Sequence, residues 1–191
     1  MKKIKLGYFA DGPWSHQALD KLLIDDTIQV QFVCVRNDRP DPVLKIKAQE
    51  NNLEFIKNAK INSIEFINKL KNYGCDLFVS MSFNQVFHPE ILSLPPLKTI
   101  NCHAGKLPFY RGRNILNWAL INDEKEFGIT VHFVDEGIDT GDIIKQQCYP
   151  INDHDDYKTL LVKSYVQCAN ILYESIKSIQ EDKVTRISQK S

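Results

Sequence analysis

Short apolar segments alternate with helical segments through the first hundred residues, and this alternation constrains the fold most. Strand-length apolar runs occur at 4–10, 28–35, 53–56, 76–81 and 97–102. Between them we expect helices at 17–24, 43–51 and 64–72, with Pro42 in one first turn and Ser63 as a cap. This order is typical of an α/β domain, with helices on both faces of a mostly parallel, twisted sheet.

The second half of the chain continues the pattern. Asn114 is expected to cap a helix at 115–121, and strands are expected at 129–134 and 142–149. A long helix follows, capped by Asp153 or Asp155 and ending near 179, with apolar residues at steps of three and four. One domain is therefore predicted over 1–180. Residues 181–191 form a polar tail, with one short strand expected at 184–187.

The residues with the most chemical capability lie between Thr99 and Ile144. Asn101 and His103 stand two positions apart at the end of a predicted strand, so their side chains should leave the same face. Cys102 should then point to the opposite face. The loop after this strand contains glycines, a proline and several cations. The carboxyl end of a strand in such a sheet is where ligands bind, so this is the predicted site.

A second loop, at 135–141, contributes a carboxylate from Asp139. An amide, an imidazole and a carboxylate suit the transfer of an acyl group to an amine. The amide and the imidazole can stabilise an oxyanion. The imidazole or the carboxylate can accept the proton that the attacking amine loses. The sequence leaves open whether His103 or Asp139 is that acceptor.

Two motifs carry a family resemblance. The run N-C-H-A-G-K-L-P-F-Y-R-G-R-N at 101–114 is followed by V-D-E-G-I-D-T-G-D-I-I at 134–144. Together they resemble the signature of the 10-formyltetrahydrofolate-dependent formyltransferases: Asn-x-His, a Leu-Pro loop and an Asp-x-Gly some forty residues on. The resemblance implies a Rossmann-like formyltransferase domain with N10-formyltetrahydrofolate as co-substrate. It implies a catalytic trio of Asn101, His103 and Asp139, and a cis peptide at Leu107–Pro108.

The resemblance also implies binding residues. The folate side is expected to include Met81, Phe83, Val86, Asp135, Glu136 and Gly137. The amine substrate is expected to contact Gly12, Trp14, Ser15, Lys106, Tyr110, Arg111, Arg113 and Asn114. The turn at 11–16 joins a strand to a helix, where free backbone N–H groups bind phosphate well. Core packing is an equally valid reading for Trp14, Phe83 and Val86.

Within the family, the loop after the histidine discriminates between substrates. The run at 104–114 looks most like that of the bacterial enzymes that N-formylate dTDP- or UDP-linked 3-amino or 4-amino deoxysugars, so a nucleotide-linked amino sugar for surface polysaccharide is expected. Glycinamide ribonucleotide transformylase is the alternative, because a single domain of this length resembles it. A non-catalytic folate- or nucleotide-sugar-binding module is a third reading, which an intact trio disfavours. A homodimer is left open.

Composition limits the remaining classes. Lys plus Arg and Asp plus Glu both number 24, so no broad positive field attracts nucleic acid, which counts against a tRNA substrate. The five cysteines are scattered, without metal-ligand spacing, and indicate reduced thiols in a cytoplasmic protein. No metal site, signal peptide or membrane-spanning segment is expected. The tRNA-binding C-terminal domain of methionyl-tRNA formyltransferase is also not recognised.

Overall fold

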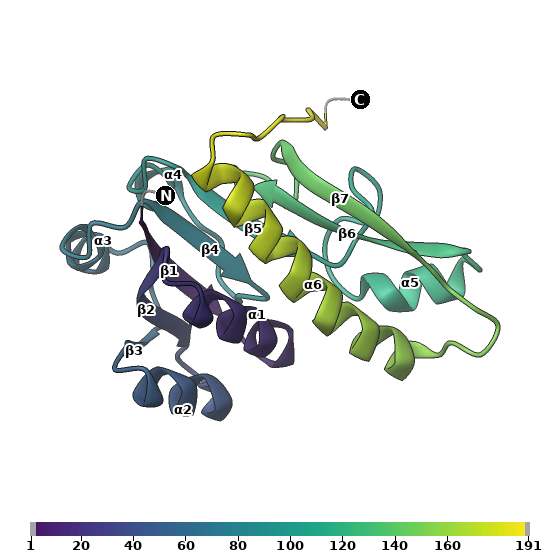
Figure 1. Cartoon of the computed structure of the whole chain (residues 1–191), viewed down its shortest axis with the longest axis horizontal. Helices are drawn as coiled ribbons and strands as arrows, with labels where there is room; N and C mark the ends of the chain where they lie inside the picture. Colours follow the sequence, from purple (N-terminus) through teal and green to yellow (C-terminus); the bar gives the residue numbers. More distant parts are fainter. Residues whose placement is uncertain (1–2, 190–191) are drawn as a thin grey trace.

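The computed structural model describes residues 3–189 and contains one seven-stranded sheet in the order β3-β2-β1-β4-β5-β6-β7 (Figure 1). The strands are β1 Ile4–Ala10, β2 Ile28–Arg36, β3 Glu54–Asn58, β4 Leu77–Met81, β5 Thr99–His103, β6 Glu126–Phe133 and β7 Ile143–Pro150. The helices are α1 Pro13–Ile24, α2 Pro42–Glu50, α3 Ile64–Lys71, α4 Pro89–Leu92, α5 Ile115–Ile121 and α6 Tyr157–Gln180. The predicted α/β class is confirmed.

The sheet changes character along its width. Strands β1 to β5 pair in parallel, whereas β6 runs antiparallel to both β5 and β7. From β1 the chain adds β2 and β3 towards one edge of the sheet, and it then returns to add β4 and β5 towards the other edge. Ligands bind where the order of strands reverses in this way, outside the carboxyl ends of the strands. The residues that follow β1, β4 and β5 therefore meet at one edge.

Two buried clusters cover the two faces of the sheet. Alternation along β1 shows the division, because Tyr8 lies in the cluster with α1 and α6 whereas Phe9 lies in the cluster with α3 and α4. Helices α1 and α6 pack side by side on one face (Figure 1). There the rings of Trp14 and Tyr165 pack edge to face, with 4.9 Å between their centroids. On the other face of β6, the loop 104–112 takes the place of a helix.

Several predicted details are confirmed. Pro42 begins α2, and the Ser63 side chain accepts a hydrogen bond from the Phe66 backbone at the start of α3. The peptide Leu107–Pro108 is cis. The Cys102 side chain lies on the face of β5 towards α6, because its Sγ lies 3.7 Å from the Cys168 carbonyl; Cys102 nevertheless lines one end of the cavity.

Other details were wrong at the helix ends. Asn114 precedes α5 in a left-handed conformation, φ 58°, and its side chain makes no capping bond. Asp156, rather than Asp153 or Asp155, caps α6, in a reciprocal box with Thr159. Helix α1 begins at Pro13, four residues earlier than expected, because proline is tolerated in a first turn. Helix α5 begins at the predicted residue, Ile115, whereas the first residues of α1 and α6 were not predicted.

The segment after α6 returns to the sheet instead of leaving it (Figure 1). The expected strand at 184–187 is reduced to one antiparallel bridge, in which Ile187 exchanges backbone bonds of 2.9 and 2.8 Å with Ile143. Arg186 lies over the Phe133 ring, 4.4 Å from its centroid. The segment therefore covers the ends of β6 and β7. Within residues 3–189 no helix is long and apolar enough to cross a membrane.

Candidate active site

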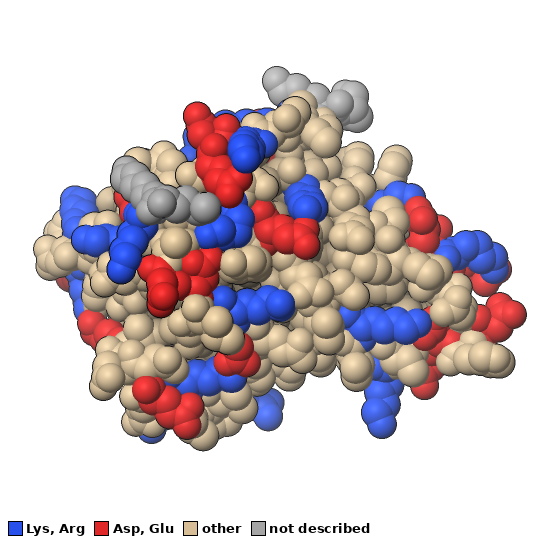
Figure 2. All heavy atoms as spheres, viewed as in Figure 1, with Lys and Arg blue, Asp and Glu red and all other residues tan. Residues whose placement is uncertain are grey.

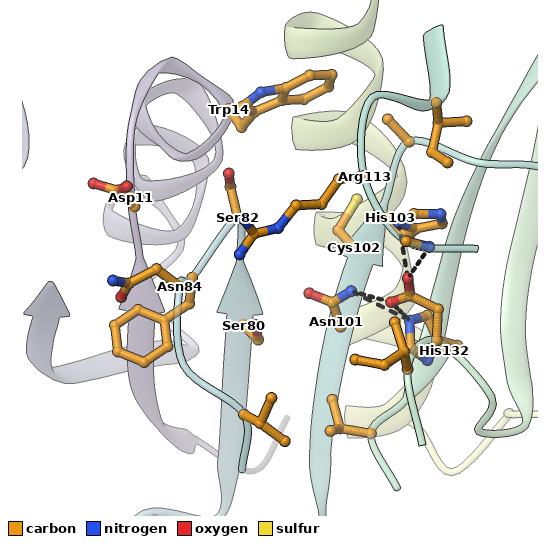
Figure 3. A pocket seen from close by; sticks show the side chains of 18 of the residues that line it. Asp11, Trp14, Ser80, Ser82, Asn84, Asn101, Cys102, His103, Arg113 and His132 are labelled. Atoms are coloured by element: carbon orange, nitrogen blue, oxygen red, sulfur yellow. Dashed lines mark hydrogen bonds and ion pairs between the residues drawn. The ribbon is translucent and has the colours of Figure 1, made fainter. Parts of the chain in front are cut away.

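A cavity of about 610 Å³ opens where the carboxyl ends of β1, β4 and β5 meet (Figure 3). This volume is ordinary for a site that binds small molecules. Its walls come from the ends of those strands, from the loop before α5 and from the loop after β6. The lining includes all three residues of the predicted trio, together with Ser82, Arg113 and His132.

Asp139 is the centre of the site. Its Oδ2 lies 3.5 Å from His103 Nδ1, and its Oδ1 lies 3.4 Å from both His132 Nε2 and Asn101 Nδ2. The backbone N–H of Gly112 donates to Oδ2 at 2.9 Å. The structure therefore brings the three residues of the predicted trio into contact, although Asn101 and Asp139 are 38 positions apart in sequence.

The backbone explains how Asp139 reaches this position. Asp139 has φ 54°, a left-handed conformation that aspartate tolerates better than most residues. Two positions later, a side chain at Gly141 would overlap the Phe133 carbonyl, so only glycine lets the loop return this tightly against β6. The Asp-x-Gly spacing thus has a steric reason here.

Hydrogen bonding fixes the tautomer of His103. Its Nε2 lies 2.7 Å from the Tyr110 carbonyl, which can only accept, so Nε2 carries the proton. Nδ1 is then the basic nitrogen, and it faces Asp139. Burial lowers the pKa of His103 below its usual value; the Asp139 carboxylate and the Tyr110 bond oppose this effect without reversing it. His103 is therefore a neutral imidazole near pH 7.

Asp139 stays ionised. Burial acts to raise its pKa, but the interactions with His132 and His103 and the hydrogen bond from the Gly112 N–H outweigh burial, so the pKa lies below the usual value. The Asp139 side chain is only 14% exposed, so water screens its negative charge weakly from the imidazoles of His103 and His132.

His132 is a functional candidate that the sequence analysis missed. It stands directly opposite Asn101 in the β5–β6 pairing, so the two side chains share one face of the sheet. Its Nδ1 donates to the Phe133 carbonyl at 2.8 Å, which leaves Nε2 as an acceptor 3.2 Å from Asn101 Nδ2. His132 alternates along β6 with the buried Val131 and Phe133 of the α6 face, and only its pairing with Asn101 shows that it belongs to the site.

Asn101 is oriented by these neighbours. Its Nδ2 faces the Asp139 carboxylate and His132 Nε2, so its carbonyl oxygen faces the cavity (Figure 3). The amide expected to stabilise an oxyanion thus has its N–H groups directed at protein acceptors. To serve an oxyanion, one of them must turn from these contacts of 3.2 and 3.4 Å.

The loop after β5 is anchored on β6. Thr130 Oγ1 donates to the Gly105 carbonyl at 2.7 Å, and a side chain at Gly105 would overlap the His103 ring. Gly128 leaves room for the backbone of Lys106 in the same way, and the Lys106 ammonium pairs with Glu126. This close packing fixes the position of Tyr110, whose carbonyl orients His103.

The predicted substrate residues divide into two groups. Trp14, Arg113 and Asn114 line the cavity, and Arg113 extends into it between Ser82 and Asn101 (Figure 3). Arg113 has no ion-pair partner among residues 3–189. The others do not line the cavity: Lys106 pairs with Glu126, Tyr110 OH donates to Glu124, and Arg111 donates to Gln189. Their contact with substrate stays a prediction.

The turn before α1 is less suited to phosphate than expected. Pro13 supplies no N–H at the first helical position, and the Ser15 hydroxyl is buried and donates to the Gly12 carbonyl at 2.7 Å. Asp11, which the sequence analysis did not single out, lines the cavity at this turn. Arg36 also lines the cavity, but its guanidinium is bound by Asp38 at 2.7 Å and Asp11 at 3.4 Å. Neither Gly12 nor Ser15 lines the cavity.

The predicted folate residues also divide. Phe83, Val86, Asp135 and Gly137 line the cavity, whereas Met81 is buried in the core and Glu136 lies outside the lining. Asn84 adds a polar group that the sequence analysis did not single out. Its Oδ1 is buried without a hydrogen-bond partner, an unmet acceptor that a ligand N–H could satisfy. No group of three or more His, Cys, Asp or Glu side chains within 3–189 is arranged to hold a metal ion.

Comparison with known proteins agrees with this geometry. The profile of the formyl transferase family matches residues 9–176. The chain belongs to this family. The methionyl-tRNA formyltransferase of Acetivibrio thermocellus is 32% identical over 177 residues, which cover 88% of this chain and 57% of the relative. That of Azobacteroides pseudotrichonymphae is 38% identical over 156 residues, 77% of this chain and 48% of the relative. The chain thus spans about half the length of the curated relatives it matches.

Solved structures share the fold. Glycinamide ribonucleotide transformylase 1 from Symbiobacterium toebii superposes with a TM-score of 0.84 at 24% identity, over 97% of this chain and 95% of that one. The sugar 3N-formyl transferase WlaRD, solved with dTDP and 5-N-formyl-THF, has a TM-score of 0.75 at 23% identity, over 100% of this chain and 68% of that one. At these identities the likeness concerns the fold, which is thus the Rossmann-like fold expected from the sequence.

Proposed function

We propose that this formyl transferase moves the formyl group of N10-formyltetrahydrofolate to the primary amine of a nucleotide-linked amino-deoxysugar. The observation that carries the proposal is the convergence of Asn101, His103 and Asp139 on the wall of one cavity, together with the family match. The bound folate supplies an activated formyl carbon. The amine nitrogen bonds to the formyl carbon and the bond from that carbon to N10 breaks, so the proton accepted from the amine has to return to N10 of the leaving tetrahydrofolate. The protein's own task is to orient the amine, carry this proton and stabilise the charge on the formyl oxygen.

His103 is the proton acceptor in this proposal. Its lowered pKa keeps it neutral, and its basic Nδ1 faces Asp139. After it accepts a proton, both ring nitrogens face acceptors, namely the Tyr110 carbonyl and the Asp139 carboxylate. The site therefore stabilises the imidazolium that transfer creates. Asn101 meets the substrates from the same wall: its carbonyl oxygen can accept from the amine, and a turned N–H can donate to the formyl oxygen.

The folate is assigned to the side of the cavity formed by Phe83, Val86 and the 135–139 loop. Val86 is 54% exposed in spite of its apolar side chain, and the unpartnered Asn84 Oδ1 lies among these residues. A flat heterocycle with N–H donors fits this combination of apolar surface and unmet acceptor.

Arg113 supports a diphosphate-linked substrate. Its guanidinium projects into the cavity from the loop before α5 and has no ion-pair partner among the described residues. A free guanidinium binds diphosphate oxygens with two parallel bonds. The turn at 11–15, by contrast, presents the Asp11 carboxylate and lacks the Pro13 N–H, so it favours an uncharged or cationic group, such as the sugar amine.

A second candidate is the charged tRNA named by the curated relatives, which are more than 30% identical to this chain. Against it stand the net charge of +0 and the interspersed positive and negative side chains on the face of α1 and α6 (Figure 2). Among small amine substrates, glycinamide ribonucleotide is the alternative to the nucleotide-linked amino sugar.

A turnover assay with three classes of amine separates these candidates. The purified chain is given N10-formyltetrahydrofolate with dTDP- and UDP-linked 3-amino and 4-amino deoxysugars, with glycinamide ribonucleotide, or with methionyl-tRNA. We expect formylated nucleotide sugar as the product, and Arg113→Met should raise its KM at least about tenfold because a bidentate charged contact is lost. Product from glycinamide ribonucleotide or methionyl-tRNA alone would contradict the sugar assignment. No product from any amine would contradict the formyl transfer itself.

A further inference from the structure

The segment after α6 places one buried amide between the two loops of the site. Gln189 is only 8% exposed although its neighbours from 185 to 188 are exposed. Its Nε2 donates to the carbonyls of Asp139, at 3.1 Å, and Gly141, at 2.6 Å. Its Oε1 accepts from Arg111 Nη2 at 3.0 Å. None of the roles proposed for Asn101, His103 or Asp139 in formyl transfer explains why Gln189 is buried.

The chemistry of the partners fixes the orientation of the amide. Backbone carbonyls can only accept and a guanidinium can only donate. The Gln189 amide therefore satisfies all three partners in one orientation and none of them in the flipped orientation. A carboxylate at this position would satisfy Arg111 but would repel the two carbonyl oxygens.

These contacts close a ring of interactions around Asp139. The Asp139 backbone carbonyl is held by Gln189, and its carboxylate is held by the Gly112 N–H at 2.9 Å. Arg111, which precedes Gly112 in the chain, donates a hydrogen bond to Gln189 and so completes the ring. The bridge between Ile187 and Ile143 and the contact of Arg186 with Phe133 fix the segment that carries Gln189.

We propose that Gln189, together with Arg111, is a positioning residue for Asp139. The amide ties the 135–141 loop to the loop before α5 and thereby sets the distance between the Asp139 carboxylate and His103. This inference deepens the proposed function and rests on it for its kinetic consequence. It also gives Arg111 a different role from the substrate contact that the resemblance implied.

The test compares Gln189→Met, Arg111→Met and the double variant in the full chain. Methionine keeps the shape of glutamine and removes all three hydrogen bonds. With the amine and folate that the wild type turns over, we expect kcat to fall about tenfold in each single variant, with KM for both substrates within about twofold, because a small displacement of a catalytic group is costly. The double variant should be no slower than the singles, since both break one ring. Thr185→Ala is the matched control, because Thr185 lies in the same segment, is exposed and makes no hydrogen bond with the residues that the structure describes.

A second readout needs no turnover. The ionisable groups that face His103 are Asp139 and His132, and Asp139 raises the His103 pKa. If the carboxylate moves away in Gln189→Met, the NMR titration midpoint of the His103 ring must fall, while Thr185→Ala leaves it unchanged. The His103→Gln spectrum assigns the signal.

An unchanged midpoint overturns the inference, even if no amine is turned over and the proposed function fails. So does a kcat within twofold of the wild type. An increase in the KM of the amine with unchanged kcat in Arg111→Met would overturn it as well, in favour of direct substrate contact by Arg111.

Discussion

One carboxylate organises the site at the scale of single residues. Asp139 contacts two imidazoles and one amide, and each of these side chains is held from its other side by a backbone group or a neighbour. The carboxylate and the two imidazoles are therefore preorganised, whereas Asn101 has to turn an N–H towards the formyl oxygen during reaction. The individual roles are therefore separable by substitution.

His103→Gln and Asp139→Asn are each expected to lower kcat/KM at least about 100-fold, the usual cost of losing acid–base catalysis. His154→Gln is the matched control, because this histidine is exposed on the loop before α6. Steady-state kinetics with the formylated amine as product measures all three. A loss below about tenfold in both site variants would exclude them as the proton-transfer pair.

The pH dependence follows from the same residues. His103 must be neutral to accept a proton, and burial lowers its pKa. We therefore expect kcat/KM to rise with pH through a midpoint below the ordinary histidine value of about 6.5 and then to level off. Asp139 opposes the lowering, so the midpoint should move further towards acid in Asp139→Asn. A midpoint above 6.5 would favour a protonated His103 as the working form.

At the scale of elements, the carboxylate of Asp25 connects two helices. Asp25 ends α1, and its carboxylate accepts bonds from the Thr27 N–H at 2.8 Å, from Tyr173 OH at 2.8 Å and from Lys177 Nζ at 2.9 Å. It thus connects the α1–β2 turn to α6. Burial acts to raise the pKa of Asp25, but these hydrogen bonds outweigh it and hold the pKa well below its usual range.

Asp25→Asn should lower the free energy of unfolding at pH 7 by about 2 kcal/mol, because charged hydrogen bonds across two elements are weakened. A depressed carboxylate pKa stabilises the fold above the unfolded value of about 3.9, and this contribution is lost as the pH falls through the folded pKa. The difference between variant and wild type should therefore shrink in acid. Urea unfolding at pH 7 and pH 3 measures it, with exposed Asp26→Asn as the control. A difference that grows in acid would contradict the assignment.

Charge balance matters at the scale of the whole molecule. The net charge is +0 and both signs are interspersed on the face in Figure 2, so the molecule presents no field for a polyanion there. For a small amine substrate we expect kcat/KM to change less than about threefold between 50 and 200 mM salt. Binding through six to ten phosphates would lose about 10³–10⁵ in affinity over this range. A steep salt dependence would therefore favour the tRNA candidate.

The parts that sequence predicted well are those set by local pattern. The strand and helix order, the cap at Ser63 and the convergence of Asn101, His103 and Asp139 were available from spacing and resemblance. His132 was missed because its importance depends on antiparallel pairing with Asn101, and register between strands 31 residues apart is not a local property. Gln189 was placed in a polar tail for the same reason: its three partners lie 48 to 78 positions away.

The antiparallel edge of the sheet has a consequence for folding. Strands β1 to β4 and their helices can pair without β6 or β7, but the contact of Asn101 with His132 and the position of Asp139 require both edge strands in register. We therefore expect a refolding chain to recover formyl transfer only after β6 and β7 have paired with β5, and not when β1 to β4 alone have formed.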